Sequence, residues 1–306
     1  MPTVALHYDV EGWAYHRRCL ALQKYAPADF TVTLGNGRQH DRRETCDLVL
    51  QLCYNHIREL RRSYKQRGLA PVMVAGVNVG YTERNARWIA SAVQDADYVV
   101  LNNRDCFERA GSPAKTTWIS NGVDRDLFRI RVPIEDRKPR VLWTGSLFHR
   151  PLKGYDEFLI PISRRLWKDG IKCDFRLVDS HGGPSRRTPE EMADWYNTGT
   201  VYLCSSSSEG TPNPALEAAA SGCTIVSTPV GNMPELIQPG VNGYLADRSV
   251  DALYSAVKQA VDNYREQSAA MQSRIVEWGW DRRAAAYFEL FRKLLTSSPK
   301  KVRRRI

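Results

Sequence analysis

The sequence lacks a C-x-x-C pair, and its seven cysteines are scattered and odd in number. We therefore expect no disulfide framework and no metal site, but buried free thiols in a reducing compartment. No apolar run approaches the roughly 18 residues that a membrane-spanning helix needs. The first residues, MPTVALHYDVEGWAY, lack the basic start and the apolar run of a secretory signal. These absences predict a cytoplasmic protein.

Positive charge is in excess and unevenly placed. The formal net charge is +10, and the final segment KKVRRRI supplies five of these charges. We expect residues 297–306 to be a solvated basic tail that is suited to peripheral contact with an anionic membrane or to nucleic acid. A second basic cluster lies in HIRELRRSYKQRG, which we interpret as a solvated helix face, with docking of a polyanion as the alternative.

Short apolar runs alternate with amphipathic stretches along the whole chain, which predicts an α/β fold of parallel sheets covered by helices. The charged, proline-containing segment RIRVPIEDRKPR is typical of a linker, after which the alternation restarts. We predict a doubly wound domain at 1–130 and another at 138–280, with ligands bound in the cleft between them. Helices are expected near 249–263, near 265–277 and at 281–296. Asp281 would cap the last helix, which can pack back on the N-terminal domain.

The stretch SSSSEGTPNPALEAAASG places two glutamates around the start of a predicted helix at 214–221. Asn213 is the expected N-cap, and Gly222 the expected end. Free N–H groups of Ala215 and Leu216, with the helix dipole, would favour a phosphate. Glu209 and Glu217 would accept hydrogen bonds from sugar hydroxyls. Two glutamates eight residues apart carry little information alone, so the functional interpretation of this stretch depends on the motifs around it.

Those motifs resemble family 4 retaining glycosyltransferases, which have the GT-B fold of two Rossmann-like domains facing a central cleft. EGTPNPALEAAASGCTIVSTPVGNMPELIQPGVNGYL is similar to their glutamate–seven–glutamate signature and the loops after it. LWTGSLFHRPLKG resembles their phosphate loop, and ISNGVDRDLF their crossover between domains. The resemblance covers residues 118–296 well and the first hundred weakly.

The resemblance implies roles for individual residues. Glu217 would bind the ribose, Glu209 the donor sugar and Lys153 the diphosphate. Arg150 would supply the charge that the family takes from an arginine where this chain has Ser146. The rest of the donor site would comprise Gly145, Gly210, Thr211, Asn213 and Ala215. Gly12 would let the backbone approach a ligand closely. The chain departs from the family in the N-terminal domain, which usually binds the acceptor. The loop after the first strand has a single glycine, Gly12, and Asn78 stands where a histidine is usual.

The implied reaction moves a sugar from a nucleotide-diphosphate sugar to an acceptor hydroxyl with retention. No cofactor and no metal are expected, because Lys153, Arg150 and N–H donors would stabilise the leaving diphosphate. The D-x-D sequences at 95–97 and 124–126 are interpreted as structural. His16 and His149 are the nearest histidines for polar roles.

Several functions stay open at this point. The acceptor can be a surface glycan or a lipid-linked saccharide. It can also be a hydroxymethylated base in DNA, as for short phage-type enzymes. In that case the phosphate contacts would be Arg58, Arg61, Arg62, Arg42 and Arg43. A non-catalytic nucleotide- or polyanion-binding protein is the alternative of another class, and a sugar-nucleotide epimerase would need more acid–base residues.

Overall fold

The computed structural model describes residues 1–36, 45–179 and 187–297, and in it the chain forms two compact units. Unit 1 contains Met1–Asn121 and the C-terminal segment from Trp280, and unit 2 contains Gly122–Gly279. The basic residues Arg42 and Arg43 and the tail 298–306 lie outside the described residues. The C-terminal helix is part of unit 1, and the segment expected as a linker lies within unit 2.

Unit 1 contains a six-stranded parallel sheet in the order β2-β1-β3-β4-β5-β6. Its strands are β1 (Thr3–Tyr8), β2 (Thr31–Asn36), β3 (Leu48–Gln51), β4 (Val72–Val77), β5 (Tyr98–Leu101) and β6 (Thr116–Trp118). Val4 in β1 pairs with Val32 in β2 and with Leu48 in β3. The chain goes from β1 to one neighbour, β2, and then returns to the other side of β1 with β3. A reversal of this kind is where doubly wound sheets bind ligands.

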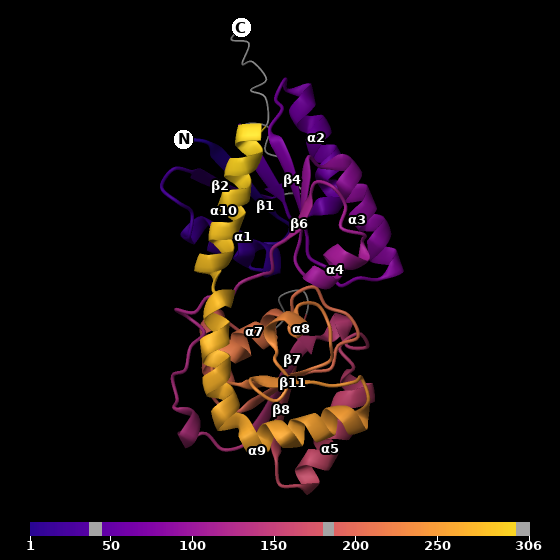
Figure 1. The fold of residues 1–306 in the computed structure, drawn as a ribbon, viewed down its shortest axis with the longest axis vertical. Coiled ribbons are helices and arrows are strands. Elements are labelled where there is room, and N and C mark those ends of the chain that lie inside the picture. The colour runs from indigo at the N-terminus through magenta and orange to yellow at the C-terminus, as the bar shows by residue number, and fades with distance from the viewer. Residues whose placement is uncertain (37–44, 180–186, 298–306) are drawn as a thin grey trace. The chain divides into compact units, whose positions relative to one another are not determined.

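The helices of unit 1 cover both faces of this sheet, as Figure 1 shows. They are α1 (Ala14–Lys24), the 3₁₀ turn η1 (Tyr54–His56), α2 (Ile57–Gln66), α3 (Glu83–Asp95), α4 (Arg104–Arg109) and α10 (Trp280–Ser297). Val4 and Leu6 point to the face that α1 and α10 cover. Ala5 and Val49 point to the face that α2, α3 and α4 cover. The alternation of side chains along each strand therefore builds two cores, one on each face.

Unit 2 contains a five-stranded parallel sheet in the order β11-β10-β9-β7-β8. Its strands are β7 (Arg140–Ser146), β8 (Lys172–Val178), β9 (Val201–Cys204), β10 (Thr224–Ser227) and β11 (Gly243–Leu245). Here the chain goes from β7 to β8 and then returns to the other side of β7 with β9. The point of reversal therefore lies between β7 and β9.

The helices of unit 2 likewise cover two faces (Figure 1). They are η2 (Ile134–Asp136), η3 (Leu147–His149), the π-helical turn η4 (Tyr155–Leu159), α5 (Ile160–Lys168), α6 (Pro189–Tyr196), α7 (Asn213–Ala220), α8 (Met233–Leu236), α9 (Val250–Ile275) and η5 (Val276–Trp278). Val141 and Trp143 pack against α5 and the first half of α9. Leu142 and Tyr202 pack against α6, α7 and α8.

Three local predictions are wrong. One continuous helix, α9, replaces the two expected near 249–263 and 265–277. Tyr264 lies where a break between two helices was expected. It is buried and donates its hydroxyl to the Arg137 carbonyl at 3.2 Å, so the polar residues around it still have one side packed inward and the helix continues. Helix α10 begins at Trp280, so Asp281 is in its first turn and is not its cap. Helix α7 begins at Asn213, one residue earlier than expected.

The segment expected as a linker is anchored to unit 2 by two buried residues, Ile134 and Arg137, although most of its other residues are exposed. Arg137 is buried and donates to the carbonyls of Gly199 at 3.1 Å and Ser221 at 2.9 Å, and to Asn197 Oδ1 at 2.7 Å. The seven cysteines, all within the described ranges, form no disulfide bond with one another, and five of them are buried. Within the described ranges, no helix combines the length and the hydropathy that crossing a membrane would require.

Candidate active site

The main candidate site lies in unit 2, at the carboxyl ends of β7 and β9. The loop after β7 carries Lys153, and the loop after β9 carries Glu209. Because β7 and β9 are parallel neighbours, both loops leave the same edge of the sheet. This edge contains the reversal in strand order, where open α/β sheets bind their ligands.

Lys153 and Glu209 form an ion pair at this edge, through Lys153 Nζ and Glu209 Oε1. Their side chains are 22% and 12% exposed, so the pair is largely buried. Burial lowers the pKa of Lys153, but the charge of Glu209 and the hydrogen bond to it outweigh burial and leave that pKa raised. Ser206 donates to the same carboxylate oxygen at 2.6 Å. The ammonium is therefore kept protonated and held at this edge, where a phosphate could replace Glu209 as its partner.

The two loops are joined by hydrogen bonds that fix the pair. Ser205 donates its hydroxyl to the Lys153 carbonyl at 2.7 Å, and the Ser207 N–H bonds the Leu152 carbonyl at 2.9 Å. Gly154 has φ +68°, and a Cβ there would lie 3.1 Å from the Ser205 carbonyl oxygen. A side chain at this position would push the loops apart, so the sequence KG after β7 allows their close approach.

The loop after β10 packs against the same site. Gly231 has φ +53°, and a Cβ there would lie 2.2 Å from the Gly210 carbonyl oxygen and 3.0 Å from that of Glu209. The buried Asn232 donates its amide to Thr211 Oγ1 at 3.0 Å. At Gly145 a Cβ would lie 2.5 Å from the Trp143 ring and 3.4 Å from Lys153 Cγ. Glycines thus allow the segments around the charged pair to pack closely.

Glu217 is in α7, the helix that follows the Glu209 loop in the same connection between β9 and β10. It accepts a hydrogen bond from the Tyr196 hydroxyl at 2.9 Å. Burial, followed by the charge of Glu217, raises the pKa of Tyr196 well above its usual range, so its hydroxyl stays a donor. Tyr196 thereby holds one carboxylate oxygen of Glu217. The sequence did not single out Tyr196, because its position follows from α6 packing against α7.

The expected phosphate site at the start of α7 is not present as predicted. The N–H groups of Ala215 and Leu216 bond the Pro212 carbonyl at 2.9 and 3.3 Å, and the Asn213 N–H bonds the Thr211 carbonyl at 2.9 Å. The prolines fold the segment before α7 into a turn whose carbonyls occupy these donors. Among the expected anion-binding groups, Lys153 is therefore the principal one at this edge.

Arg150 does not join the pair. Its guanidinium forms an ion pair with Asp156 and lies over the Tyr155 ring at 5.0 Å. Ser146 ends β7 and has a buried hydroxyl without a hydrogen-bond partner. His149 follows in η3, and burial together with the charge of Lys153 lowers its pKa below the usual 6.5.

The remaining predicted residues lie in unit 1, except for the second D-x-D, which lies near the start of unit 2. Gly12 has φ +73°, and its N–H donates to His16 Nδ1 at 2.8 Å. Asp95 and Asp97 of the first D-x-D pair with Arg58 and Arg61, each at 3.0 Å. That D-x-D is therefore structural, and two charges of the basic cluster on α2 are neutralised. In the second, Asp124 accepts from the Asp126 N–H at 3.1 Å, a local turn.

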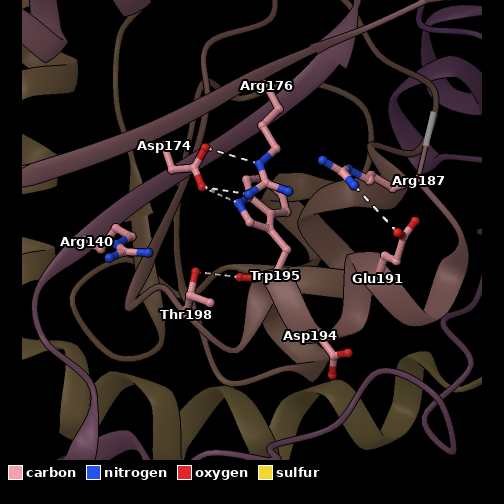
Figure 2. A pocket seen from close by; sticks show the side chains of 8 residues that line it. All are labelled: Arg140, Asp174, Arg176, Arg187, Glu191, Asp194, Trp195 and Thr198. Atoms are coloured by element: carbon pink, nitrogen blue, oxygen red, sulfur yellow. Dashed lines mark hydrogen bonds and ion pairs between the residues drawn. The ribbon is translucent and has the colours of Figure 1, made fainter. Parts of the chain in front are cut away.

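A separate pocket of about 310 Å³ in unit 2 is lined by Arg140, at the amino end of β7, and so does not lie at the carboxyl edge that carries Lys153. Figure 2 shows the side chains that line it. Asp174 of β8 accepts hydrogen bonds there from Arg176 and from Trp195 Nε1, the latter at 2.7 Å. Arg187 pairs with Glu191 at 3.5 Å. The charges that line this pocket largely satisfy one another, and none of the predicted site residues lines it. We therefore place the functional site by the strand reversal and not by this pocket.

Comparison with known proteins agrees with this architecture. Residues 181–263 match the family model described as Glycosyl transferases group 1. D-inositol 3-phosphate glycosyltransferase from Geodermatophilus obscurus is 28% identical over 258 residues, which is 70% of this chain and 57% of that protein. The enzyme of this name from Streptomyces griseus is 27% identical over 118 residues, 37% of this chain and 25% of that protein. The chain thus spans between a quarter and three fifths of these relatives.

Solved structures show the same fold. Sucrose-phosphate synthase from Thermosynechococcus elongatus superposes with a TM-score of 0.70 at 16% identity, over 97% of this chain and 100% of that one. HepE of Anabaena, solved with UDP and glucose, superposes with a TM-score of 0.72 at 14% identity and the same coverage. The predicted GT-B fold and the resemblance to glycosyltransferases are confirmed. Membership of family 4 stays a prediction.

Proposed function

We propose that this chain is a retaining glycosyltransferase that moves a sugar from a nucleotide-diphosphate sugar to an acceptor hydroxyl without a metal ion. The observation that carries the proposal is the Lys153–Glu209 pair at the reversal between β7 and β9. An ammonium group there suits a diphosphate, and a carboxylate beside it suits sugar hydroxyls. The relatives are glycosyltransferases by name, and the HepE structure contains UDP, which supports a nucleotide-sugar donor.

Each residue has a defined role in the proposed reaction. The C1–O bond of the donor breaks, and its electron pair goes to the leaving β-phosphate oxygen, where Lys153 stabilises the negative charge. The acceptor oxygen bonds C1 on the same face, and its proton passes to the leaving phosphate. Glu209 accepts hydrogen bonds from the donor sugar, and Glu217, held by Tyr196, accepts them from the ribose. Neither carboxylate becomes bonded to the sugar.

We propose a saccharide acceptor, either a surface glycan or a lipid-linked saccharide. The DNA alternative depended partly on the basic face of α2. Arg58 and Arg61 on that face already pair with Asp95 and Asp97, so they have less charge to offer to phosphates. The names of the relatives add D-inositol 3-phosphate as an acceptor to test.

The test is transfer of radiolabelled sugar from UDP- and GDP-sugars. The acceptors would be a lipid-linked saccharide extract, D-inositol 3-phosphate and hydroxymethylated duplex DNA. Label in the lipid-linked saccharide or in D-inositol 3-phosphate supports the proposed transferase. Label in DNA would replace the saccharide acceptor with a DNA base. No transfer to any acceptor, together with tight nucleotide binding, would contradict the enzymatic proposal and favour a binding protein.

Lys153→Met is the matched variant for this test. Removing the ammonium should cut transfer by at least a hundredfold, because one preorganised charge on the leaving group contributes about 2.7–4 kcal/mol. Lys172→Met, in the exposed first position of β8, should leave the rate unchanged. Equal rates for both variants would remove Lys153 from the mechanism.

A further inference from the structure

The second point of strand reversal, between β1 and β3 in unit 1, also carries a pocket. It has a volume of about 270 Å³. Asp9 follows β1 directly, and the turn η1 after β3 consists of Tyr54, Asn55 and His56. Trp88 of α3 completes the wall. The volume is close to the lower limit of roughly 300 Å³ for small-molecule sites, which suits one ring rather than a chain.

The walls of this pocket are aromatic. The rings of Tyr54 and Trp88 lie 6.4 Å apart, and Tyr15 of α1 also lines the space. Trp88 is 38% exposed, although most large apolar side chains of this unit are buried. The Arg84 guanidinium lies over its ring at 4.7 Å and holds the indole in place. A fixed aromatic face of this kind attracts C–H bonds that carry partial positive charge, such as those on the less polar face of a pyranose.

Polar groups enter the same space. Asp9 supplies a carboxylate, and Asn55 an amide that both donates and accepts. His56 Nδ1 lies 3.2 Å from Glu59 Oε2, and because a carboxylate only accepts, Nδ1 must donate. In the neutral imidazole, Nε2 is then an acceptor for a hydroxyl. Burial raises the pKa of Tyr54 to about 12, so its hydroxyl remains a donor at neutral pH.

The charge of the lining separates two classes of ligand. No lysine or arginine lines this pocket and Asp9 is negative; the Arg84 guanidinium lies over the Trp88 ring but does not line the space. A flipped nucleotide brings its own phosphate and those of its neighbours with it, and a single cation beside the pocket would not neutralise them. A neutral sugar ring needs an aromatic face, a carboxylate and amide or imidazole acceptors, all of which are present.

We propose that this pocket binds a neutral pyranose ring of the acceptor, packed on Trp88 and hydrogen-bonded by Asp9. That the ring belongs to the acceptor rests on the proposed transferase activity. Affinity of the pocket for a sugar ring does not depend on that activity, so the two can fail separately.

The experiment is saturation-transfer difference NMR of the full chain. The probes are methyl glycosides of glucose, galactose, mannose and N-acetylglucosamine, with 5-hydroxymethyl-2′-deoxycytidine 5′-monophosphate alongside. Trp88→Ala should weaken binding of the preferred glycoside at least tenfold, and Trp88→Phe should retain it within threefold, because it keeps an aromatic face. Asp9→Asn should also weaken it.

Trp118→Ala is the matched control. Trp118 belongs to the same unit, is 37% exposed, and has Phe107 at 4.9 Å and Arg104 at 5.8 Å from its ring, but it does not line the pocket. This variant should bind the glycoside as the parent does. Equal affinity in the Trp88→Ala variant, binding of the nucleotide alone, or binding of no probe would each overturn the proposal. Glycoside binding without any transfer would overturn the proposed function and leave this pocket assignment intact.

Discussion

Glu209→Gln tests what the ion pair does before a donor binds. The substitution keeps the shape of the side chain but leaves the Lys153 ammonium without a charge partner. Breaking a fully buried pair costs about 3–5 kcal/mol, and an exposed pair is worth about 0–1 kcal/mol. With side chains 22% and 12% exposed, this pair lies between those limits, at about 2 kcal/mol. For a domain of roughly 150–250 residues, this corresponds to a fall in Tm of about 4–8 °C.

The same variant should bind a nucleotide diphosphate more tightly. In the parent, the phosphate must take Lys153 away from Glu209 and sit beside a second negative charge. In Glu209→Gln both penalties are reduced, so we expect about tenfold higher affinity for UDP or GDP, or about 1.4 kcal/mol. Transfer should fall, because Glu209 no longer supplies a carboxylate to the donor sugar. Thermal unfolding with and without nucleotide, together with calorimetric titration, measures both effects.

Glu157→Gln is the control, because Glu157 pairs at 3.7 Å with Arg248 and is 68% exposed. It should change Tm by less than about 2 °C and leave nucleotide affinity unchanged. If Glu209→Gln weakens UDP and GDP binding as Lys153→Met does, the reasoning is wrong. Glu209 would then bind the nucleotide directly, and would not serve as the counter-charge of the empty site.

Three further predictions follow from the geometry. Glu217→Ala should raise the KM for the donor at least tenfold, and Tyr196→Phe only about threefold, in steady-state transfer assays; equal effects would contradict the ribose role of Glu217. Gly231→Ala should cost about 2–4 kcal/mol in denaturant unfolding, because its Cβ would meet the Gly210 carbonyl, whereas Gly170→Ala, also at positive φ but in open space, should cost about 1 kcal/mol. Because the pKa of Lys153 is raised above 10.5, the stability that the pair adds over Lys153→Met should be complete below about pH 10 and should decline as the pH rises further; a decline between pH 7 and 9 would contradict it.

Much of the fold follows from local patterns in the sequence. The buried strand VYLC reads as a continuous apolar run, as expected for a parallel sheet covered on both faces. Positive-φ glycines after helices, such as Gly68 and Gly222, mark where α2 and α7 end. The extent of α9 could not be read in this way, because the inward direction of Tyr264 depends on Arg137, more than a hundred residues earlier.

The site was only partly predictable for the same reason. Motif spacing identified Lys153 and Glu209, and the order of the strands brings them together. Motif spacing could not show that the Pro212 carbonyl takes the N–H groups of Ala215 and Leu216, because that depends on the turn before α7. Nor could it reveal the aromatic pocket of unit 1, whose residues come from α1, η1 and α3.

The two strand reversals of the chain carry different chemistry, and the difference is informative. In unit 2 the reversal holds a lysine and a carboxylate, which fit a diphosphate and a sugar. In unit 1 it holds aromatic rings and a single carboxylate, without lysine or arginine among the lining residues. A diphosphate placed against Asp9 would meet repulsion, and a neutral ring placed at Lys153 would leave its charge unused. The charge distribution therefore supports the two proposals, that unit 2 binds the diphosphate of the donor and that unit 1 binds a neutral sugar ring.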